Sequence, residues 1–447
     1  MSILITNATL LTMDPQTGVI APGAVLIEGE HIAALGSVTQ LEACRSCAQT
    51  VIDAGDRLVM PGLICAHTHF YGAFARGMAL PGDPPAEFAQ LLERLWWRLD
   101  KALDLESVRL SALVCLIDAI RHGTTTLIDH HASPNAVEGS LDVLAESVQA
   151  AGVRASLCYE VSDRDGLACA RAGMGENERF AHRLAQSPDP HLGATFGLHA
   201  LMTLSPHTLE TCAGLAADLG VGCHIHVAEG QGDVQDSLAR YGCRVVERLV
   251  DAGVLGARSI AAHAIHIDEV EKDLLAGTQT AVVHNPRSNM NNAVGAADVC
   301  GLLERGALLG LGNDGFSNNM FTEMHTAYLI HKHAAADPRA MPADQVLRIA
   351  FEHNAQIAAR AGLPAGLGVL GVGAPADLIV VDYAPPTPFT AQNAPWHVLF
   401  GIDGSGVDTV IVGGRVLMRG RRLLTLDEAE IAAQSRAAAA QLWERIM

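Results

Sequence analysis

The middle of the chain, residues 59–366, contains eight short apolar runs separated by amphipathic stretches of helical periodicity. The runs are continuously apolar rather than alternating, which is typical of strands buried on both faces of a parallel sheet. They are GLICAHTHF (62–70), TTTLIDHH (124–131), VRASLCYE (153–160), ATFGLHA (194–200), VGCHIHVAE (221–229), SIAAHAIH (259–266), TAVVHNP (280–286) and ALLGLGNDG (307–315). Eight buried strands alternating with helices predict an α/β fold, the (β/α)8 TIM barrel.

The two ends of the chain have a different texture, with short alternating strands and turns. Residues 1–58 include ILITNATLL and AVLIEGEHIAALG, and residues 367–425 include ADLIVVDY and two apolar runs joined by Gly413-Gly414. A Gly-Gly pair between apolar runs favours a tight hairpin. We expect both segments to pair into one small β-sandwich domain, with the barrel (59–366) inserted between them. Residues 426–447 are predicted to form an amphipathic C-terminal helix packed on the body.

The charge balance limits the partners that such a surface can bind. The chain has 49 acidic and 30 basic residues and a net charge of -19, which repels nucleic-acid backbones and anionic membranes. The N-terminus lacks the basic start of a signal peptide, and no apolar run is long enough to span a membrane. The 10 cysteines lie mostly within apolar runs, as expected for reduced, buried thiols. We therefore expect a cytoplasmic protein that binds a small molecule.

Metal-chelating side chains recur at the C-terminal ends of the predicted barrel strands. These residues are His67 and His69 after the first run, His224, His226 and Glu229 after the fifth, His263 after the sixth and Asp314 after the eighth. Alternate residues of a strand point to the same face, so the two imidazoles of a His-x-His pair can reach one ion. The strand ends converge at the mouth of a barrel. Burying so many polar groups without an ion would leave them unsatisfied, so the pattern predicts a metal site.

Four of these motifs, PGLICAHTHF, HIHVAE, AAHAIH and GNDG, resemble the signature regions of the amidohydrolase superfamily. The chain looks like the branch that contains cytosine, guanine, 8-oxoguanine and adenosine-type deaminases and the triazine hydrolases. HTHFYGAFARGM, LWWRLD, DHHASP and HNPRSNMNN are most similar to the SsnA-like aminohydrolases of that branch. The resemblance covers nearly the whole chain, including both β segments.

The resemblance implies four ligands of one divalent metal ion, which are His67, His69, His226 and Asp314. Zinc is the expected ion and iron is the alternative, because nitrogen and carboxylate ligands suit both. The ion would lower the pKa of its water to about 7, and the resulting hydroxide would attack a ring carbon that bears an amino group. His263 would orient the water and Glu229 would shuttle protons, so the implied catalytic set is Glu229, His263 and Asp314. The expected activity is release of ammonia from an amino-substituted purine, pyrimidine, pterin or triazine-like ring.

The chain contains only three lysines, Lys101, Lys272 and Lys332, and none falls at the end of a predicted barrel strand. Two-metal members of the superfamily bridge their ions with a carboxylated lysine at such a strand end. The sequence therefore predicts a mononuclear site. It counts against ring opening of the dihydropyrimidinase or dihydroorotase type.

Several residues near the predicted mouth are candidates for contacts with the substrate. His199 ends the fourth run, where relatives place a histidine near the substrate. Trp96 and Trp97 follow the first run in a chain with only 4% aromatic residues, and they favour a lid over a planar ring, with core packing or a dimer contact as the alternative. Arg76 could bind a carbonyl or carboxylate, or form a surface ion pair. Arg287 would favour an acidic or oxo-substituted ring.

Other roles stay open at this point. Glu160 and the residues 129–131 end the third and second runs, and both could line the pocket or serve structural hydrogen bonds. A hydrolytic dehalogenase or N-dealkylase of triazines would use the same metal centre with another leaving group. A non-catalytic assembly protein of the same fold is a remote alternative, which the complete ligand set disfavours. We expect a homodimer.

Overall fold

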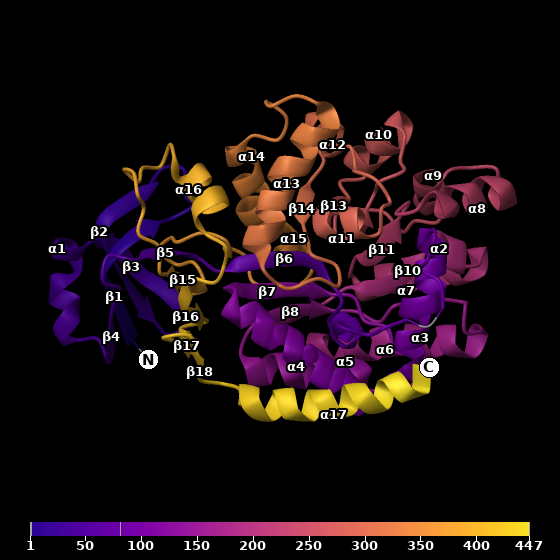
Figure 1. Cartoon of the computed structure of the whole chain (residues 1–447), viewed down its shortest axis with the longest axis horizontal. Coiled ribbons are helices and arrows are strands. Elements are labelled where there is room, and N and C mark those ends of the chain that lie inside the picture. The colour runs from indigo at the N-terminus through magenta and orange to yellow at the C-terminus, as the bar shows by residue number, and fades with distance from the viewer. Residues whose placement is uncertain (1, 81, 447) are drawn as a thin grey trace.

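The eight apolar runs form a closed barrel of parallel strands in the computed structural model, which describes residues 2–80 and 82–446 (Figure 1). Its strands are β6 (Leu63–Thr68), β7 (Thr124–Asp129), β8 (Arg154–Leu157), β9 (Leu192–Ala194), β10 (Phe196–Ala200), β11 (Cys223–Val227), β12 (Ile260–His263), β13 (Ala281–His284) and β14 (Leu309–Leu311). Only Thr195 separates β9 from β10, so these two make the fourth barrel strand. Bridges from Thr68 to Asp314 and from Val161 to Leu198 join the two arcs of the barrel. The predicted fold class is confirmed.

Helices surround the barrel and bury apolar faces against its strands. Helix α4 (Leu105–Arg121) is capped by Asp104, whose Oδ1 accepts the Ser107 N–H at 2.8 Å. The helix buries Val108, Leu116 and Ile120. The other helices of the barrel region are α5 (Ser140–Ala151), α6 (Leu167–Gln186), α7 (Pro206–Leu219), α8 (Gln231–Tyr241), α9 (Val245–Asp251), α10 (Glu269–Gly277), α11 (Pro286–Asn291), α12 (Val299–Glu304), α13 (Met320–Ala335), α14 (Ala343–Arg348) and α15 (Asn354–Arg360).

Strands from both chain ends form one mostly antiparallel sheet beside the barrel (Figure 1). They are β1 (Ser2–Leu11), β2 (Val19–Glu28), β3 (His31–Ser37), β4 (Thr50–Asp53), β5 (Leu58–Pro61), β15 (Leu378–Val381), β16 (Val407–Val412), β17 (Arg415–Arg419) and β18 (Arg422–Leu423). β5 pairs with β15, which joins the N-terminal strands to the C-terminal ones. Gly413 and Gly414 have φ of 53° and 71° in the predicted hairpin, and a side chain at Gly414 would meet the Gly29 carbonyl oxygen at 2.1 Å. A short helix, α1 (Val38–Leu41), follows β3.

The connection from β6 to α4 folds over the C-terminal end of the barrel. It contains a 3-10 segment (Phe70–Ala75), α2 (Phe88–Leu91), a π-helical turn (Leu92–Trp96) and α3 (Trp97–Ala102). The π-helical turn inserts an extra residue before α3, a device that often marks functional sites. This connection carries Trp96, Trp97 and Asp100 to the mouth of the barrel.

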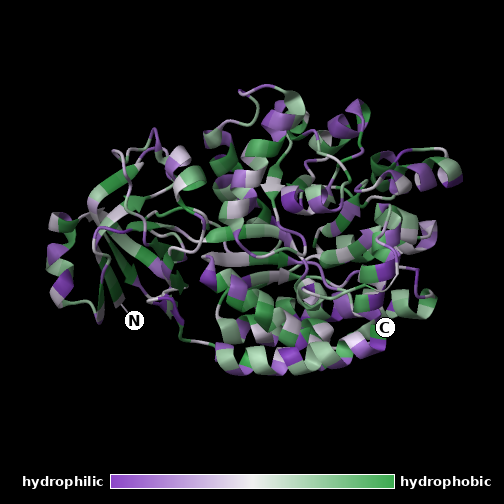
Figure 2. Ribbon diagram, in the orientation of Figure 1, coloured by the Kyte–Doolittle hydropathy of each residue, from purple (hydrophilic) through white to green (hydrophobic). Residues whose placement is uncertain are grey.

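The C-terminal helix α17 (Glu428–Ile446) packs along α4 and α3, and hydrophobic and hydrophilic residues alternate along it (Figure 2). Arg121 pairs with Glu428 at its start. Near its end the Trp443 indole N–H donates to the Phe74 carbonyl at 2.8 Å, so the helix also contacts the connection after β6. A further helix, α16 (Ala394–Gly401), lies before β16. Among the described residues, no helix combines the length and apolar character that crossing a bilayer requires.

Candidate active site

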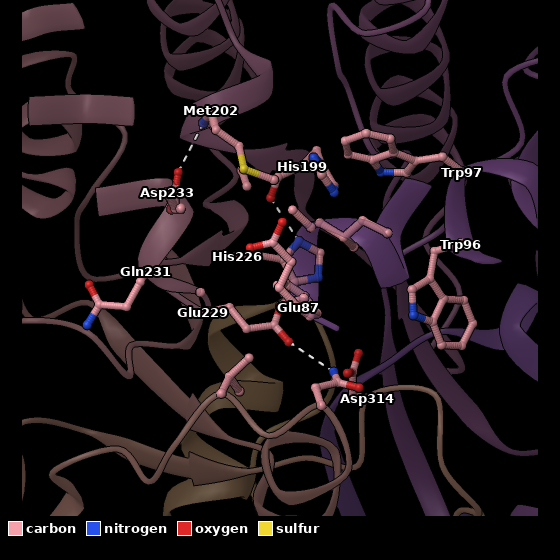
Figure 3. Close-up of a pocket in the computed structure, with 18 of the residues that line it drawn as sticks. Glu87, Trp96, Trp97, His199, Met202, His226, Glu229, Gln231, Asp233 and Asp314 are labelled. Atoms are coloured by element: carbon pink, nitrogen blue, oxygen red, sulfur yellow. Dashed lines mark hydrogen bonds between the residues drawn. The ribbon is translucent and has the colours of Figure 1, made fainter. Parts of the chain in front are cut away.

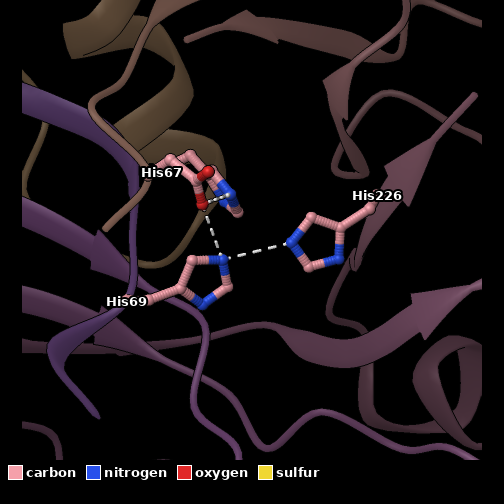
Figure 4. Close-up of side chains that lie close together, drawn as sticks. His67, His69 and His226 are labelled. Atoms are coloured by element: carbon pink, nitrogen blue, oxygen red, sulfur yellow. Dashed lines mark hydrogen bonds and ion pairs between the residues drawn. The ribbon is translucent and has the colours of Figure 1, made fainter. Parts of the chain in front are cut away.

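Four side chains from three distant barrel strand ends meet at the centre of the mouth. One donor atom from each of His67, His69, His226 and Asp314 lies within 4.8 Å of all the others. Oδ1 of Asp314 is 3.0 Å from Nε2 of His69 and 3.5 Å from Nε2 of His67. Nε2 of His69 is 3.2 Å from Nε2 of His226 (Figure 4). The structure therefore brings together the four residues that the resemblance implied as ligands.

The hydrogen bonds behind these imidazoles fix which nitrogen faces the cluster. Nδ1 of His69 donates to the His130 carbonyl at 2.6 Å, and Nδ1 of His226 donates to the His199 carbonyl at 2.8 Å. In the neutral rings both Nε2 atoms then present lone pairs to each other. Nε2 of His67 is buried without a hydrogen-bond partner among the described residues. Lone pairs that converge on one point, with a carboxylate beside them, fit a divalent cation.

The pKa values of two of these histidines also favour a bound cation. Burial lowers the pKa of His67 to about 3, which keeps that ring neutral and able to act as a ligand. Although burial also disfavours the charged form of His69, hydrogen bonding to Asp314 and the charge of that carboxylate raise its pKa to about 9. The cluster therefore favours a positive charge at the position that Nε2 of His69 and Asp314 share.

The backbone at two of the strand ends adopts a conformation that non-glycine residues rarely take. His263 has φ of 72° and Asp314 has φ of 59°. His263 ends β12, and Asp314 lies in the turn after β14, which ends at Leu311. The left-handed backbone at both positions turns the chain at the mouth of the barrel. Ser288 donates its hydroxyl to Oδ2 of Asp314, and Thr68 donates to the Asp314 carbonyl at 3.0 Å. Strain of this kind persists where the surroundings hold it, and it is common at active sites.

Glu229, His263 and Asp314 form a second group that shares Asp314 with the first. Nδ1 of His263 donates to Oδ1 of Asn289 at 2.9 Å, so its buried Nε2 is a free acceptor 3.6 Å from Oε2 of Glu229. Oε1 of Glu229 accepts from the Asn292 amide at 3.3 Å. Burial raises the pKa of Glu229 to about 7. The group can thus accept and return a proton beside the histidine cluster.

A cavity of about 480 Å³ opens directly above these groups, large enough for a heterocycle with a substituent. Figure 3 shows Trp96 and Trp97 on one side of it and Gln231 and Asp233 on the other, with His226 and Glu229 between them. The polar and aromatic residues that line it include His69, Tyr71, Glu87, Trp96, Trp97, Asp100, Glu160, His199, His226, Glu229, Gln231, Asp233, Asn292 and Asp314.

The structure places only some of the predicted substrate contacts at this cavity. His199 and Trp96 line it, but Arg76 and Arg287 do not. Arg76 is exposed and follows the 3-10 segment after β6. Arg287 is turned toward the protein, where its Nε donates to Glu323 at 2.6 Å and its Nη2 donates to the Ser317 carbonyl at 2.7 Å. The Arg287 guanidinium therefore holds the loop after Asp314, and the prediction that it faces the substrate is corrected.

Sequence reasoning left several contributing residues unassigned or open. Ser288, Asn289 and Asn292 support the two catalytic groups from α11 and its end, and their spacing in HNPRSNMNN places them on one side of a helical turn. Glu160 lines the cavity, and its Oε2 also lies 3.2 Å from Nδ1 of His130, so both features left open for it are present. His130 is structural, because its Nε2 donates to the carbonyls of Leu198 and His224 at 3.1 Å.

All three lysines lie in helices away from the strand ends. Lys101 is in α3, Lys272 in α10 and Lys332 in α13. Their amines pair with Asp165, with Glu269 and Asp298, and with backbone carbonyls, respectively. None of them can supply a bridging carbamate at the mouth of the barrel.

Curated relatives match the chain over nearly its whole length. A protein named 5'-deoxyadenosine deaminase from Methanosarcina mazei is 34% identical over 448 residues, covering 99% of both chains. A protein named 5-methylthioadenosine/S-adenosylhomocysteine deaminase from Syntrophobacter fumaroxidans is 36% identical over 436 residues, covering 96% of this chain and 95% of the relative.

Solved structures share the fold over the same extent. A zinc-bound adenosine deaminase from Xanthomonas campestris superposes with a TM-score of 0.87 at 26% identity, covering 98% of both chains. The atrazine chlorohydrolase TrzN from Arthrobacter aurescens, solved with zinc, has a TM-score of 0.82 at 24% identity, covering 98% of this chain and 100% of that one. At 24% identity, the similarity to TrzN shows a shared fold only. The sequence model of the amidohydrolase family matches residues 58–417 of this chain. The prediction of an aminohydrolase that acts on a nitrogen heterocycle is therefore confirmed. The chain belongs to the amidohydrolase family.

Proposed function

We propose that this chain is a mononuclear metal-dependent aminohydrolase that removes the exocyclic amino group of a 6-aminopurine nucleoside. One observation carries the proposal, namely that Asp314 belongs both to the histidine cluster and to the group with Glu229 and His263. A cation site and a proton-transfer site are thereby joined at one carboxylate, at the floor of a ring-sized cavity. The full-length relatives named as deaminases of adenosine-type compounds support the substrate class.

His67, His69, His226 and Asp314 would hold the ion, for which we propose zinc. A divalent ion at this position supplies Lewis-acid activation of water at neutral pH. The free Nε2 of His263 would accept a hydrogen bond from a water held at this position, and the Asp314 carboxylate would take up a proton from it. The Glu229 carboxyl would give a proton to the ring nitrogen next to the reacting carbon and regain one from the added hydroxyl as the carbonyl forms. Asp314 or Glu229 would protonate the amino group, which leaves as ammonia. Each such proton transfer is worth about 10²–10⁴-fold in rate.

His199 and the two tryptophans would position the ring. Trp97 stands edge-on to His199, with ring centroids 6.1 Å apart, and Trp96 contacts Tyr71 in the same way at 6.4 Å. The flat faces and edges of these rings suit a planar heterocycle between them. The dehalogenase alternative has no comparable support, because the similarity to the triazine hydrolases is a similarity of fold.

The test is ammonia release from the zinc-loaded protein with adenosine, 5'-deoxyadenosine, 5'-methylthioadenosine, guanine and cytosine, together with chloride release from a chlorotriazine. We expect turnover of the adenosine compounds at least about 100-fold above that of the others. Glu229→Gln should keep its metal and lose at least about 100-fold in rate. Glu352→Gln is the matched control, since Glu352 is 53% exposed and does not line the cavity, and its rate should stay within about twofold. Turnover of the chlorotriazine alone, or a Glu229→Gln variant of normal rate, would overturn the proposal.

A cytoplasmic location, a homodimer and the division into a β domain (1–58 and 367–425), a barrel (59–366) and a terminal helix are further proposals. The acidic surface and reduced thiols support the first. Light scattering of the purified protein tests the second, and limited proteolysis near residues 58, 366 and 426 tests the third.

A further inference from the structure

The wall of the cavity beside His199 is built from carboxylates. Six of the residues that line the cavity are acidic, and among the described lining residues none is a lysine or an arginine. Three of the six, Glu229, Asp233 and Asp314, lie at the floor or on the far side, and Glu87 is exposed at the mouth. The remaining two, Asp100 and Glu160, have side chains only 1% and 3% exposed. We call these two residues the acidic wall.

Each residue of the acidic wall has an oxygen that is not satisfied by the protein. Oε1 of Glu160 lies 3.8 Å from Nη2 of Arg164 and 3.9 Å from Nε2 of His199, both beyond hydrogen-bond distance. Oδ1 of Asp100 is buried and has no hydrogen-bond partner among the described residues. Glu160 lines the cavity, so its unpaired oxygen can accept a hydrogen bond from a bound molecule. Oδ1 of Asp100 has essentially no exposed surface, so Asp100 contributes through its charge.

Arg164, the arginine that contacts the wall, does not itself line the cavity. The Arg164 guanidinium bonds Asp100, lies 3.4 Å from Asp165 and stacks on Trp97 at 5.4 Å. His130, whose Nδ1 is 3.2 Å from Oε2 of Glu160, uses its other nitrogen for backbone carbonyls. Although burial opposes ionisation of Glu160, the nearby His199, His130 and Arg164 hold its pKa well below the usual range. Toward the cavity the wall therefore presents carboxylates, with no lysine or arginine among the described lining residues.

We propose that Glu160, assisted by Asp100, selects substrates whose non-reacting part is neutral or cationic and carries hydrogen-bond donors, and that it excludes substrates with a carboxylate or phosphate there. The inference rests on the proposed function, which places the reacting carbon at Asp314 and Glu229. The rest of the substrate then extends toward His199 and Trp97, and Glu160 lies between these and Arg164. For a nucleoside, that part is the sugar and its 5' substituent.

The test compares two substrates that differ in charge but hardly in shape, adenosine-5'-carboxamide and adenosine-5'-carboxylate. We expect wild-type kcat/KM for the carboxamide to exceed that for the carboxylate by about 100-fold, the scale for like charges about 5 Å apart at an effective dielectric constant of about 20. Glu160→Gln keeps the shape of the side chain and removes its charge, and it should reduce this preference at least tenfold. The control Glu352→Gln, on the surface and outside the cavity lining, should leave the preference within about twofold.

Calorimetry can measure the binding of the same two compounds to the Glu229→Gln variant, which should not turn them over. We expect the carboxamide to bind more tightly than the carboxylate. Asp100→Asn provides a second comparison if Glu160→Gln does not fold, and it should weaken the preference in the same direction. Equal kcat/KM for the two substrates, or a preference for the carboxylate through a reoriented Arg164, would overturn this inference and leave the proposed function intact. Absence of ammonia release from any adenosine compound would overturn both.

Discussion

A buried ion pair between the barrel and the neighbouring sheet offers a sharp test of the architecture. Arg154 is on β8, and Asp377 directly precedes β15. Nε and Nη2 of Arg154 donate to the two oxygens of Asp377 at 2.8 and 3.0 Å, and the side chains are 1% and 2% exposed. Nη1 also donates to the Pro190 carbonyl at 2.6 Å, and Oδ1 of Asp377 accepts the Gly413 N–H at 2.9 Å. The pair therefore ties β8 to the hairpin between β16 and β17.

Asp377→Asn leaves the Arg154 guanidinium buried without its anion. Breaking a buried pair in this way lowers the free energy of unfolding by about 3–5 kcal/mol. An unfolding entropy of about 2.1 cal/mol/K per residue gives about 0.9 kcal/mol/K for this chain, so we expect the Tm to fall by about 4 °C. Thermal unfolding of the zinc-saturated protein, followed by circular dichroism, measures this shift. Glu352→Gln is the control, because the Glu352–Arg348 pair is more than half exposed and should contribute less than about 0.5 kcal/mol.

A double-mutant cycle separates the ion pair from other effects of substitution. Arg154→Met removes the cation, and in the double variant Arg154→Met/Asp377→Asn no uncompensated charge remains. The amide oxygen that replaces the carboxylate of Asp377 can still accept from the Gly413 N–H. The double variant should therefore lose less stability than the sum of the two single losses, by at least about 1 kcal/mol. Strict additivity, or a Tm for Asp377→Asn equal to that of Glu352→Gln, would refute this reasoning.

Three further predictions concern the site. Removing metal with a chelator should abolish ammonia release and lower the Tm, because an ion bound only by the folded state stabilises it; readdition of zinc should restore both, and metal analysis before and after identifies the ion. Ser288→Ala removes the hydroxyl that bonds Oδ2 of Asp314 and should weaken metal affinity about 10–100-fold, whereas Asn291→Ala, exposed on the same helix, should not. Trp96→Ala should raise KM at least about tenfold with little change in Tm, since Trp96 lines the cavity and is only half-buried, and an unchanged KM would place the substrate elsewhere.

The barrel and its chelating residues could be predicted because the chelating residues stand at the ends of the apolar runs. Continuous apolar runs mark strands buried on both faces, and strand ends of a parallel barrel share one rim. Residues such as His67 and Asp314, far apart in the chain, are therefore adjacent for topological reasons alone. The Gly413-Gly414 turn is readable for a similar reason, since both residues need positive φ. No such rule predicts the positive φ of His263, which arises only where neighbouring strands fix the turn.

The substrate side of the cavity was less accessible because it is built from connections rather than strands. The segment from residue 70 to residue 104 reaches the mouth through a π-helical turn, and the side that Trp96 and Trp97 face depends on that extra residue. Asp100 was missed because an isolated aspartate in a short helix has no pattern. Its burial follows from the tertiary contact with Arg164, which is 64 positions away.

The two arginines and Glu160 show why residue type alone misassigns charged contacts. In a chain with 49 acidic and 30 basic residues, a guanidinium has a carboxylate of its own within reach more often than not, and Arg287 indeed pairs with the buried Glu323 at 2.6 Å. Carboxylates outnumber cations, so some must remain without a close partner. In the interior such a residue is costly unless a ligand or ion completes it. Asp314, Glu229 and Glu160 have no lysine or arginine within hydrogen-bond distance among the described residues, and all three line the cavity at the mouth of the barrel. In an acidic protein, a buried carboxylate without a lysine or arginine partner is therefore a more informative sign of a site than an arginine near the mouth.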